Sequence, residues 1–191
     1  MTRYPTIWFL RHGQTEWNSV WRLQGQLDSP LTEQGIADAR RQAVLMAPVL
    51  RENPALFVSP LGRARQTADI ALGGAAYRTD PRLMEIHAGD WQGRTRQEIL
   101  AEVPTLAEAP ALALYAAAPN AEDVAAVRAR VQAFLAELTR PSVVIAHGLL
   151  GQLLRAEVCG MDPAAAGSLS NRQGCVYLLE NGQEQVLETQ A

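Results

Sequence analysis

Three segments of the sequence place a cationic or imidazole side chain shortly after a short apolar run. Arg11 and His12 follow the first run, Arg63 lies shortly after the second, and His147 follows the third. Two guanidinium groups and two imidazoles, brought together, would bind a compact and multiply charged oxyanion. Phosphate is the obvious candidate, because the planar fork of Arg matches phosphate oxygens in pairs.

One of these imidazoles could also attack phosphorus. Because nearby cations lower the pKa of His12, we expect its ring to be neutral near pH 7 and able to act as a nucleophile. We expect His147, beside a bound dianion, to be an imidazolium that stabilises charge in the transition state. Gly13 and Gly148 would let the backbone approach the anion, and Gly148 would begin a helix whose N-terminus attracts it.

The leaving alkoxide needs a proton, and Glu85 is the candidate donor. It is a charged residue in an otherwise apolar stretch, residues 83–86. Partial burial and the negative phosphate would both favour a protonated carboxyl group. On the pattern alone, an exposed glutamate is the commoner explanation.

The elements that must position these residues alternate along the chain. Short apolar runs predict buried strands at residues 6–10, 55–58 and 142–146. Helical patterns lie between and after them, at residues 32–50, 61–72, 122–138 and 149–158, the first capped by Thr32. This alternation predicts an α/β fold, a three-layer α/β/α sandwich with a mainly parallel central sheet. The carboxyl ends of parallel strands meet at one edge, so the candidate residues should converge there.

The C-terminal part of the sequence has a different pattern. Residues 175–180 and 183–188 flank Asn181 and Gly182, a dipeptide suited to a type I′ turn, and so predict an antiparallel hairpin. We expect one domain, residues 1–191, in which residues 94–121 form a lid or substrate segment.

Composition narrows the classes of function. The chain has 191 residues, of which 48% are hydrophobic, and a formal net charge of −3. Its basic residues are scattered, which argues against a nucleic-acid partner. All the basic residues are Arg, which excludes a P-loop lysine and a lysine anchor for pyridoxal phosphate.

Cysteine usage and apolar runs suggest the setting. Only Cys159 and Cys175 are present, and no run approaches the length of a membrane span. We therefore expect a cytoplasmic protein with no membrane partner, whose partner is a small phosphorylated metabolite. The sequence leaves the oligomeric state open, a homodimer included.

Taken together, the motifs resemble those of the histidine phosphatase superfamily, in its phosphoglycerate mutase-like branch. The resemblance covers nearly the whole chain. It rests on residues 11–15 with Trp17 and Asn18, on Gly25, Asp28, residues 30–32 and Gly35, on residues 59–68, on Glu85 with Gly89, Trp91 and Gly93, and on His147 and Gly148.

The resemblance implies a role for each matched residue. His12 would carry a phosphohistidine, while Arg11, Arg63 and His147 hold the phosphoryl group. Glu85 would donate the proton and later activate water. Asn18 and Gln24 match positions that line the phosphate pocket, and neither a cofactor nor a metal is implied.

The branch contains both phosphatases and mutases, and the lid distinguishes them in our interpretation. Residues 97–127 contain no basic residue but several acidic ones, which would repel a second anion. These are Glu98, Glu102, Glu108, Glu122 and Asp123. Mutases of this type also carry a longer insertion and a longer C-terminal tail. We therefore expect a metal-independent phosphatase of small phosphate monoesters whose acceptor side is neutral or apolar.

Alternatives remain open. A phosphoglycerate mutase is the first, because Arg94 and Arg96 could hold a second anionic group. A noncatalytic phosphate sensor is the second, although it would need Arg11 and Arg63 without the histidines. His87 is more simply a solvated residue than a substrate contact. The large aromatic residues could line the acceptor pocket or pack as anchors; they are Trp17, Trp21 and Trp91.

The sequence also departs from the family pattern at three places. Gln92 stands where glutamate is common, residues 120–123 replace a Gly-Glu-Ser segment, and Leu149 replaces a second glycine.

Overall fold

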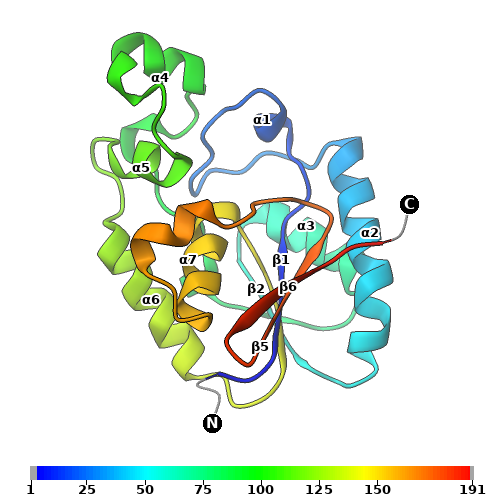
Figure 1. The fold of residues 1–191 in the computed structure, drawn as a ribbon. Helices are drawn as coiled ribbons and strands as arrows, with labels where there is room; N and C mark the ends of the chain where they lie inside the picture. Colours follow the sequence, from blue (N-terminus) through cyan, green and yellow to red (C-terminus); the bar gives the residue numbers. More distant parts are fainter. Residues whose placement is uncertain (1–3, 190–191) are drawn as a thin grey trace.

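A six-stranded sheet lies at the centre of the protein, between two groups of helices (Figure 1). The computed structural model describes residues 4–189. The strand order is β3-β2-β4-β1-β5-β6. The strands are β1 Ile7–Arg11, β2 Ala55–Val58, β3 Arg78–Thr79, β4 Ser142–Ala146, β5 Val176–Glu180 and β6 Gln183–Leu187.

Strands β1 to β4 pair in parallel, and the C-terminal hairpin is antiparallel. β4 lies between β2 and β1, with Val144 opposite Phe9. β5 runs antiparallel to β1, and β6 to β5. The mainly parallel α/β sheet with an added hairpin is therefore confirmed. At the turn Asn181 and Gly182 have φ values of 55° and 75°, as a type I′ turn requires. The edge strand β3 was not predicted, because two exposed residues carry no apolar pattern.

Four of the helices lie close to the ranges predicted from the sequence, whereas the three short ones at residues 16–19, 96–102 and 111–116 were not predicted. Thr32 caps α2 by accepting a hydrogen bond from the N–H of Gly35, as expected. The helices are α1 Glu16–Ser19, α2 Glu33–Leu50, α3 Gly62–Ala71, α4 Arg96–Glu102, α5 Ala111–Ala116, α6 Val124–Ala136 and α7 Gly148–Val158. Short 3-10 turns occupy parts of the connections, among them Pro81–Leu83 and Gly89–Trp91.

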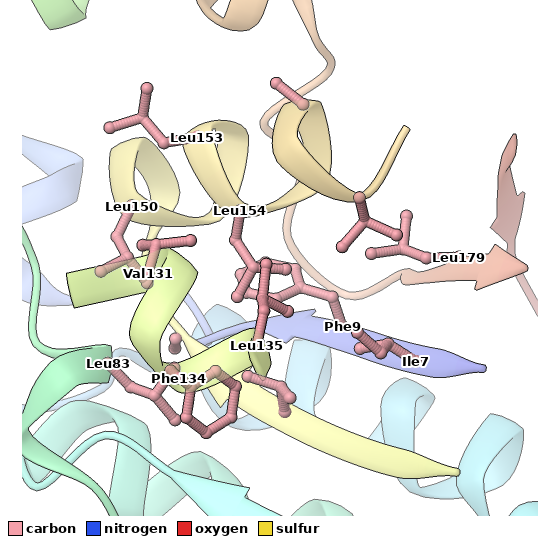
Figure 2. Packing of buried hydrophobic residues seen from close by; sticks show 14 of the residues in the cluster. Ile7, Phe9, Leu83, Val131, Phe134, Leu135, Leu150, Leu153, Leu154 and Leu179 are labelled. Carbon is pink, nitrogen blue, oxygen red and sulfur yellow. The ribbon is translucent and has the colours of Figure 1, made fainter. Parts of the chain in front are cut away.

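Alternate residues of the central strands face two separate cores. Phe9 and Val144 point to the side covered by α6 and α7, where Phe134 and Leu154 join them (Figure 2). Leu10, Val143 and Ile145 point to the other side, where α2 and α3 pack. Because side chains alternate along a strand, a fully buried strand such as β4 supplies both cores. This packing produces the three layers and fixes the ends of β1, β2 and β4 relative to one another.

The segment that includes α4 and α5 lies above the carboxyl ends of these strands (Figure 1). It has a small apolar core of its own, in which Leu23, Trp91, Ile99 and Leu114 are buried. Backbone hydrogen bonds tie it to the loop after α1. The N–H of Leu23 donates to Arg94 O at 2.9 Å, and the N–H of Arg96 donates to Trp21 O at 2.8 Å.

Candidate active site

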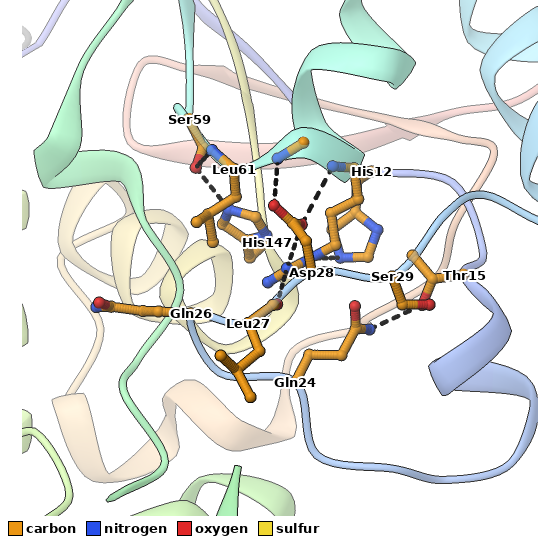
Figure 3. Close-up of polar contacts among 12 residues, drawn as sticks. His12, Thr15, Gln24, Gln26, Leu27, Asp28, Ser29, Ser59, Leu61 and His147 are labelled. Carbon is orange, nitrogen blue, oxygen red and sulfur yellow. Dashed lines mark hydrogen bonds and ion pairs between the residues drawn. The ribbon is translucent and has the colours of Figure 1, made fainter. Parts of the chain in front are cut away.

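The ends of β1, β2 and β4 bring together the residues that follow them. The rings of His12 and His147 have centroids 5.3 Å apart. Arg63 Nε lies 3.3 Å from His12 Nε2, and Ser59 Oγ lies 2.7 Å from His147 Nε2 (Figure 3). The expected convergence at one edge of the sheet is present, and its cause is the parallel pairing of the three strands.

His12 is buried and held in one tautomer. Its Nδ1–H donates to the carbonyl of Gly13 at 2.8 Å, so Nε2 carries the lone pair. That lone pair accepts a hydrogen bond from Arg63 Nε. Burial, followed by the charges of Arg63 and Arg11, holds the pKa of His12 well below its usual value. The ring is therefore neutral at pH 7, and Nε2 is the nitrogen that carries the lone pair.

His147 is completely buried, and burial also holds its pKa well below the usual value, with Arg63, His12 and Arg11 adding to the effect. In the protein alone the ring is therefore neutral, and the expected imidazolium would need a bound anion. Ser59 Oγ lies against Nε2 and also accepts a hydrogen bond from the N–H of Leu61. If Ser59 donates its hydroxyl hydrogen to Nε2, then Nδ1 carries a hydrogen. No group among residues 4–189 hydrogen-bonds to Nδ1.

Arg63 is buried, with most of its donors already occupied. Besides His12, it donates to the carbonyl oxygens of Leu27 at 2.7 Å and Gly25 at 2.8 Å, and to Asp28 Oδ1 at 2.9 Å. Asp28 also accepts hydrogen bonds from the N–H groups of Gly62 and Arg63. Arg63 therefore orients His12 and holds the loop at residues 24–28, and it has little left to donate to an anion.

Arg11 has more donors available. Its Nη1 donates to the carbonyl of Asn171 at 2.5 Å, and its buried Nε has no partner among the described residues. Gly148 lies beside it, because a Cβ added to Gly148 would stand 3.2 Å from this Nε and 2.7 Å from Asn171 Nδ2. Glycine is therefore required at position 148 because the backbone there lies close to the side chains of Arg11 and Asn171. Gly13 differs from our expectation, since a Cβ there would strike the carbonyl of Gly35 at 2.2 Å. Gly13 serves packing against α2.

Glu85 is buried and caps helix α7. Its carboxylate accepts hydrogen bonds from the N–H groups of Ile86, Leu149 and Leu150 at 2.9–3.0 Å. Two of the amides that we expected to attract an anion at the start of α7 therefore bind Glu85. The interpretation of Glu85 as an exposed residue is wrong, because its side chain closes the end of the helix.

Asn18 and Gln24 both hydrogen-bond to Thr15. Asn18 Oδ1 accepts from the N–H of Thr15, and Gln24 Nε2 donates to Thr15 Oγ1 at 2.8 Å. Gln24 Oε1 is buried without a partner among the described residues. Rotating this amide by half a turn would let the Thr15 hydroxyl donate to Oε1 and would free the NH₂ group for an anion.

A cavity of about 500 Å³ connects these residues to the lid. Its lining includes Arg11, His12, Asn18, Gln24, Arg63, Glu85 and Gly148. Our sequence reasoning missed several lining residues, namely Gln14, Arg22, Leu114, Tyr115, Asn171 and Gln173. Tyr115 lies in α5, and burial raises the pKa of its phenol to about 12. Only the fold brings these residues to the site, since nothing in their spacing marks them.

The lid does not turn its acidic side chains toward this cavity, so the expected repulsion of a second anion is wrong. Glu102 pairs with Arg94, and Glu98 caps α4 through Thr95. Within residues 4–189, the acidic residue that lines the cavity is Glu85, whereas Arg22 and Arg96 line its mouth. The acidic side chains of the lid are either paired with neighbouring groups or exposed to solvent. The order of residues in the sequence does not show this.

His87 lies outside the cavity lining and belongs to a hydrogen-bond network beside Glu85. The N–H of Gly89 donates to His87 Nδ1 at 3.0 Å, so Nε2 must carry the hydrogen. Gln92 Oε1 accepts from the N–H of Gln26 at 2.7 Å, which turns the Gln92 NH₂ group toward His87 Nε2 at 3.0 Å. The Gln92 NH₂ group and His87 Nε2–H are therefore two donors that face each other. A glutamate at position 92 would accept from both His87 Nε2–H and the N–H of Gln26.

Glu122, in the atypical segment 120–123, helps to hold the backbone beside Glu85. Glu122 pairs with Arg130 and accepts from the N–H of His87. Arg130 in turn donates to the carbonyl of Met84 at 2.7 Å. Glu122 thus keeps a structural role beside the site.

Residues 4–189 contain no cluster of three or more His, Cys, Asp or Glu side chains that could hold a metal ion. Over the same residues, no helix is both long and apolar enough to cross a membrane.

Comparison with known proteins identifies the family and the fold. Residues 7–189 match the histidine phosphatase superfamily, branch 1. The chain belongs to this superfamily. The resemblance read from the motifs is confirmed, and the chain is a phosphoric monoester hydrolase.

Three relatives are similar to this histidine phosphatase over most of their length. A glucosyl-3-phosphoglycerate phosphatase from Mycobacterium tuberculosis is 39% identical over 183 residues, covering 85% of this chain and 80% of the relative. A solved structure of the mycobacterial enzyme of that name, complexed with VO3, has a TM-score of 0.78 at 33% identity, with 91% and 92% of the two chains covered. The alpha-ribazole phosphatase from Shigella flexneri has a TM-score of 0.79 at 26% identity, with 96% of each chain covered.

A shorter match extends to the mutases. A Yersinia pestis protein named "Probable phosphoglycerate mutase GpmB" is 45% identical over 92 residues, which cover 46% of this chain and 41% of that protein.

Proposed function

We propose that this histidine phosphatase hydrolyses small phosphate monoesters without a metal, through a phosphohistidine on His12. The observation that carries the proposal is the state of His12. Its ring is neutral, its Nδ1–H is bound to Gly13, and its Nε2 lone pair lies at a cavity lined by Arg11. A nitrogen nucleophile held in one tautomer beside two cations suits attack on phosphorus.

In the first step His12 Nε2 forms a bond to phosphorus while the ester P–O bond breaks. Arg11 Nε, buried and unpartnered among the described residues, would donate to a phosphoryl oxygen. His147 Nδ1 would donate to another when Ser59 supplies the hydrogen to Nε2. Neither donor has to leave a partner that it already has, whereas His12 Nε2 must give up its hydrogen bond from Arg63 Nε when it attacks phosphorus.

The leaving oxygen takes a proton, for which Glu85 is our candidate. Its carboxylate is bound to three backbone N–H groups, so the proton must enter with the substrate. A phosphate monoester, whose second pKa is about 6, can carry it. In the second step Glu85 would take a proton from water, whose oxygen displaces His12 Nε2 from phosphorus and releases inorganic phosphate.

The named relatives suggest the kind of substrate. The matched enzymes act on glucosyl-3-phosphoglycerate and alpha-ribazole phosphate by their names. Both names describe a monoester of a small alcohol that is larger than glycerol. We propose that the partner of this site is a phosphorylated metabolite of that size.

The test is hydrolysis of p-nitrophenyl phosphate in EDTA, together with rapid-quench labelling of the protein. We expect activity in EDTA, acid-labile phosphate on the chain during turnover, and a loss of at least about 10³-fold in kcat for His12→Ala. His87→Ala is the matched control, because the His87 ring hydrogen-bonds to Gly89 and Gln92 and not to the strand-end residues. Activity that persists in His12→Ala, or turnover without labelled protein, would overturn the proposal.

A mutase is the alternative that the shorter match and the mouth arginines favour. Incubation with 3-phosphoglycerate and 2,3-bisphosphoglycerate distinguishes the two activities. We expect inorganic phosphate as the product. Efficient formation of 2-phosphoglycerate would instead identify a mutase.

A further inference from the structure

Trp21 is an exposed aromatic residue in a strained backbone conformation. Its side chain is 76% exposed, the most of the exposed large hydrophobic residues that the structure describes. Its φ is 54°, in the left-handed region that bulky residues rarely adopt. Such strain gathers at ligand clamps and other functional sites. A glycine or asparagine would relieve it, so neither core packing nor backbone preference explains a tryptophan here.

Trp21 and Arg96 lie side by side on the short ladder that joins the loop after α1 to the lid. Arg96 N–H donates to Trp21 O at 2.8 Å, and Arg22 pairs with Thr95 in an antiparallel bridge. Residues opposite each other on an antiparallel pair present their side chains to the same face. Trp21 and Arg96 both line the catalytic cavity.

The same two residues also line a second groove, of about 700 Å³, beside the first. Its other lining residues are Val20, Thr95, Gln97 and Leu100. Val20 is 52% exposed, so the groove presents apolar surface next to Trp21. The catalytic cavity and this groove therefore share a wall made of Trp21 and Arg96.

Arg96 carries a positive charge that no carboxylate of the described chain neutralises through an ion pair. Its Nη2 donates to the carbonyl of Ala107 at 2.5 Å. Arg94, two residues earlier, instead pairs with Glu102 and does not line either hollow. An unneutralised guanidinium beside an indole suits a ligand that has both a flat ring and an anionic group.

We propose that Trp21 and Arg96 form a leaving-group subsite. The alcohol of the substrate would carry a ring that stacks on Trp21 and a carboxylate or similar anion that binds Arg96. The inference rests on the proposed phosphatase function and names its substrate class. It replaces our expectation of a neutral or apolar acceptor side, which assumed that acidic lid residues face the cavity.

The first experiment compares substrates in wild type and in Trp21→Gly. The probes are benzyl phosphate, glucose 6-phosphate and the compact sn-glycerol 3-phosphate. We expect kcat/KM for a ring-bearing probe to fall about tenfold in the variant, through loss of stacking. The value for glycerol 3-phosphate should stay within about twofold, and the melting temperature should hold or rise because glycine relieves the strain. The benzyl and glucose probes distinguish an aromatic ring from a sugar ring.

The second experiment tests the cation with 2-, 3- and 4-carboxybenzyl phosphate against benzyl phosphate. In wild type we expect at least one carboxylated probe to have the higher kcat/KM. Arg96→Gln should remove that preference, by about tenfold, without changing kcat/KM for benzyl phosphate. Arg94→Gln is the matched control and should keep it. The preference should weaken with added salt, because the guanidinium is partly exposed.

Distinct outcomes separate the failure of this inference from failure of the proposed function. If neither these probes nor p-nitrophenyl phosphate is hydrolysed, the phosphatase proposal fails, and if only p-nitrophenyl phosphate is hydrolysed, the subsite is wrong. If all probes are hydrolysed and both variants keep the wild-type ratios between them, the subsite is wrong while the phosphatase stands. If Trp21→Gly instead changes the mass of the particle in sedimentation and leaves the ratios unchanged, Trp21 belongs to an interface with a second copy of the chain, and the inference is overturned.

Discussion

The phosphate end and the lid end of the cavity are built in opposite ways. At the phosphate end Arg63, Glu85 and His12 are buried and bound to backbone groups. At the lid end Trp21 stands mostly in solvent and Arg96 has one backbone acceptor for its guanidinium. Phosphoryl transfer needs donors fixed before the reaction, whereas recognition of an alcohol needs groups left free to contact it. We therefore expect chemistry and stability to depend on the first region and substrate preference on the second.

After the loss expected for His12→Ala, the largest effect should come from Glu85, which both caps α7 and, in our proposal, moves a proton. Glu85→Gln keeps an oxygen for two of the three amides and should cost about 1–2 kcal/mol in the free energy of unfolding. Its kcat should fall about 10²-fold or more, because an amide cannot donate an acidic proton. Chemical denaturation and steady-state kinetics measure the two effects.

Two further variants sharpen that test. Glu85→Ala leaves the N–H groups of Leu149 and Leu150 without their acceptor and should cost more stability than Glu85→Gln. On the lid, Glu102→Gln breaks an exposed ion pair and should leave the midpoint of chemical denaturation nearly unchanged. If Glu85→Gln is as active as wild type, then Glu85 is a structural cap only.

A second effect is the pH dependence of stability, which should come from the two buried histidines. The pKa values of His12 and His147 are held well below the usual 6.5 in the folded protein. Below pH 6.5 the unfolded chain therefore binds more protons, and stability falls as the pH falls. Each histidine contributes a slope of up to about 1.4 kcal/mol per pH unit.

Urea denaturation of wild type and His12→Gln between pH 7.5 and 5 measures this slope. The variant should have a shallower loss of stability below pH 6.5, by up to the contribution of one histidine. An identical slope in the two proteins would show that His12 becomes protonated as easily in the folded state as in the unfolded state.

The smallest effect lies between the two regions, at Gln92. Gln92→Glu replaces the NH₂ group that faces His87 with a carboxylate oxygen. The carboxylate would accept from both His87 Nε2–H and the N–H of Gln26. We expect a gain of about 1 kcal/mol, or a rise of about 2–4 °C in melting temperature. A lower melting temperature would contradict the assignment of the His87 tautomer.

The sequence predicted most of the phosphate end, because His12, Arg63 and His147 each come shortly after a recognisable strand, and Glu85 interrupts an apolar stretch. Apolar runs located β1, β2 and β4, and parallel pairing then required His12, Arg63 and His147 to meet. The short strand β3 was not recoverable, since two exposed residues give no periodicity. Asn171 and Gln173 reach the cavity from the segment before β5, and no local pattern indicates this.

The lid end illustrates the limit of sequence reasoning. Counting charges along residues 97–127 suggested an acidic wall, but Glu98, Glu102 and Glu122 are each engaged away from the cavity. Gly13 likewise has a different use, in packing against Gly35. In both cases the sequence showed which residue was present. It did not show where the acidic side chains point or what the backbone at Gly13 packs against.

What the sequence determined by itself was the order of the main strands and longer helices and the chemistry available at the strand ends, because hydrophobic periodicity and capping act over a few neighbouring residues. The tertiary structure alone decided which donors remained free, that Glu85 would close α7, and that Trp21 and Arg96 would share a wall. Those outcomes depend on contacts between residues far apart in the chain, and a linear pattern does not encode where such side chains point.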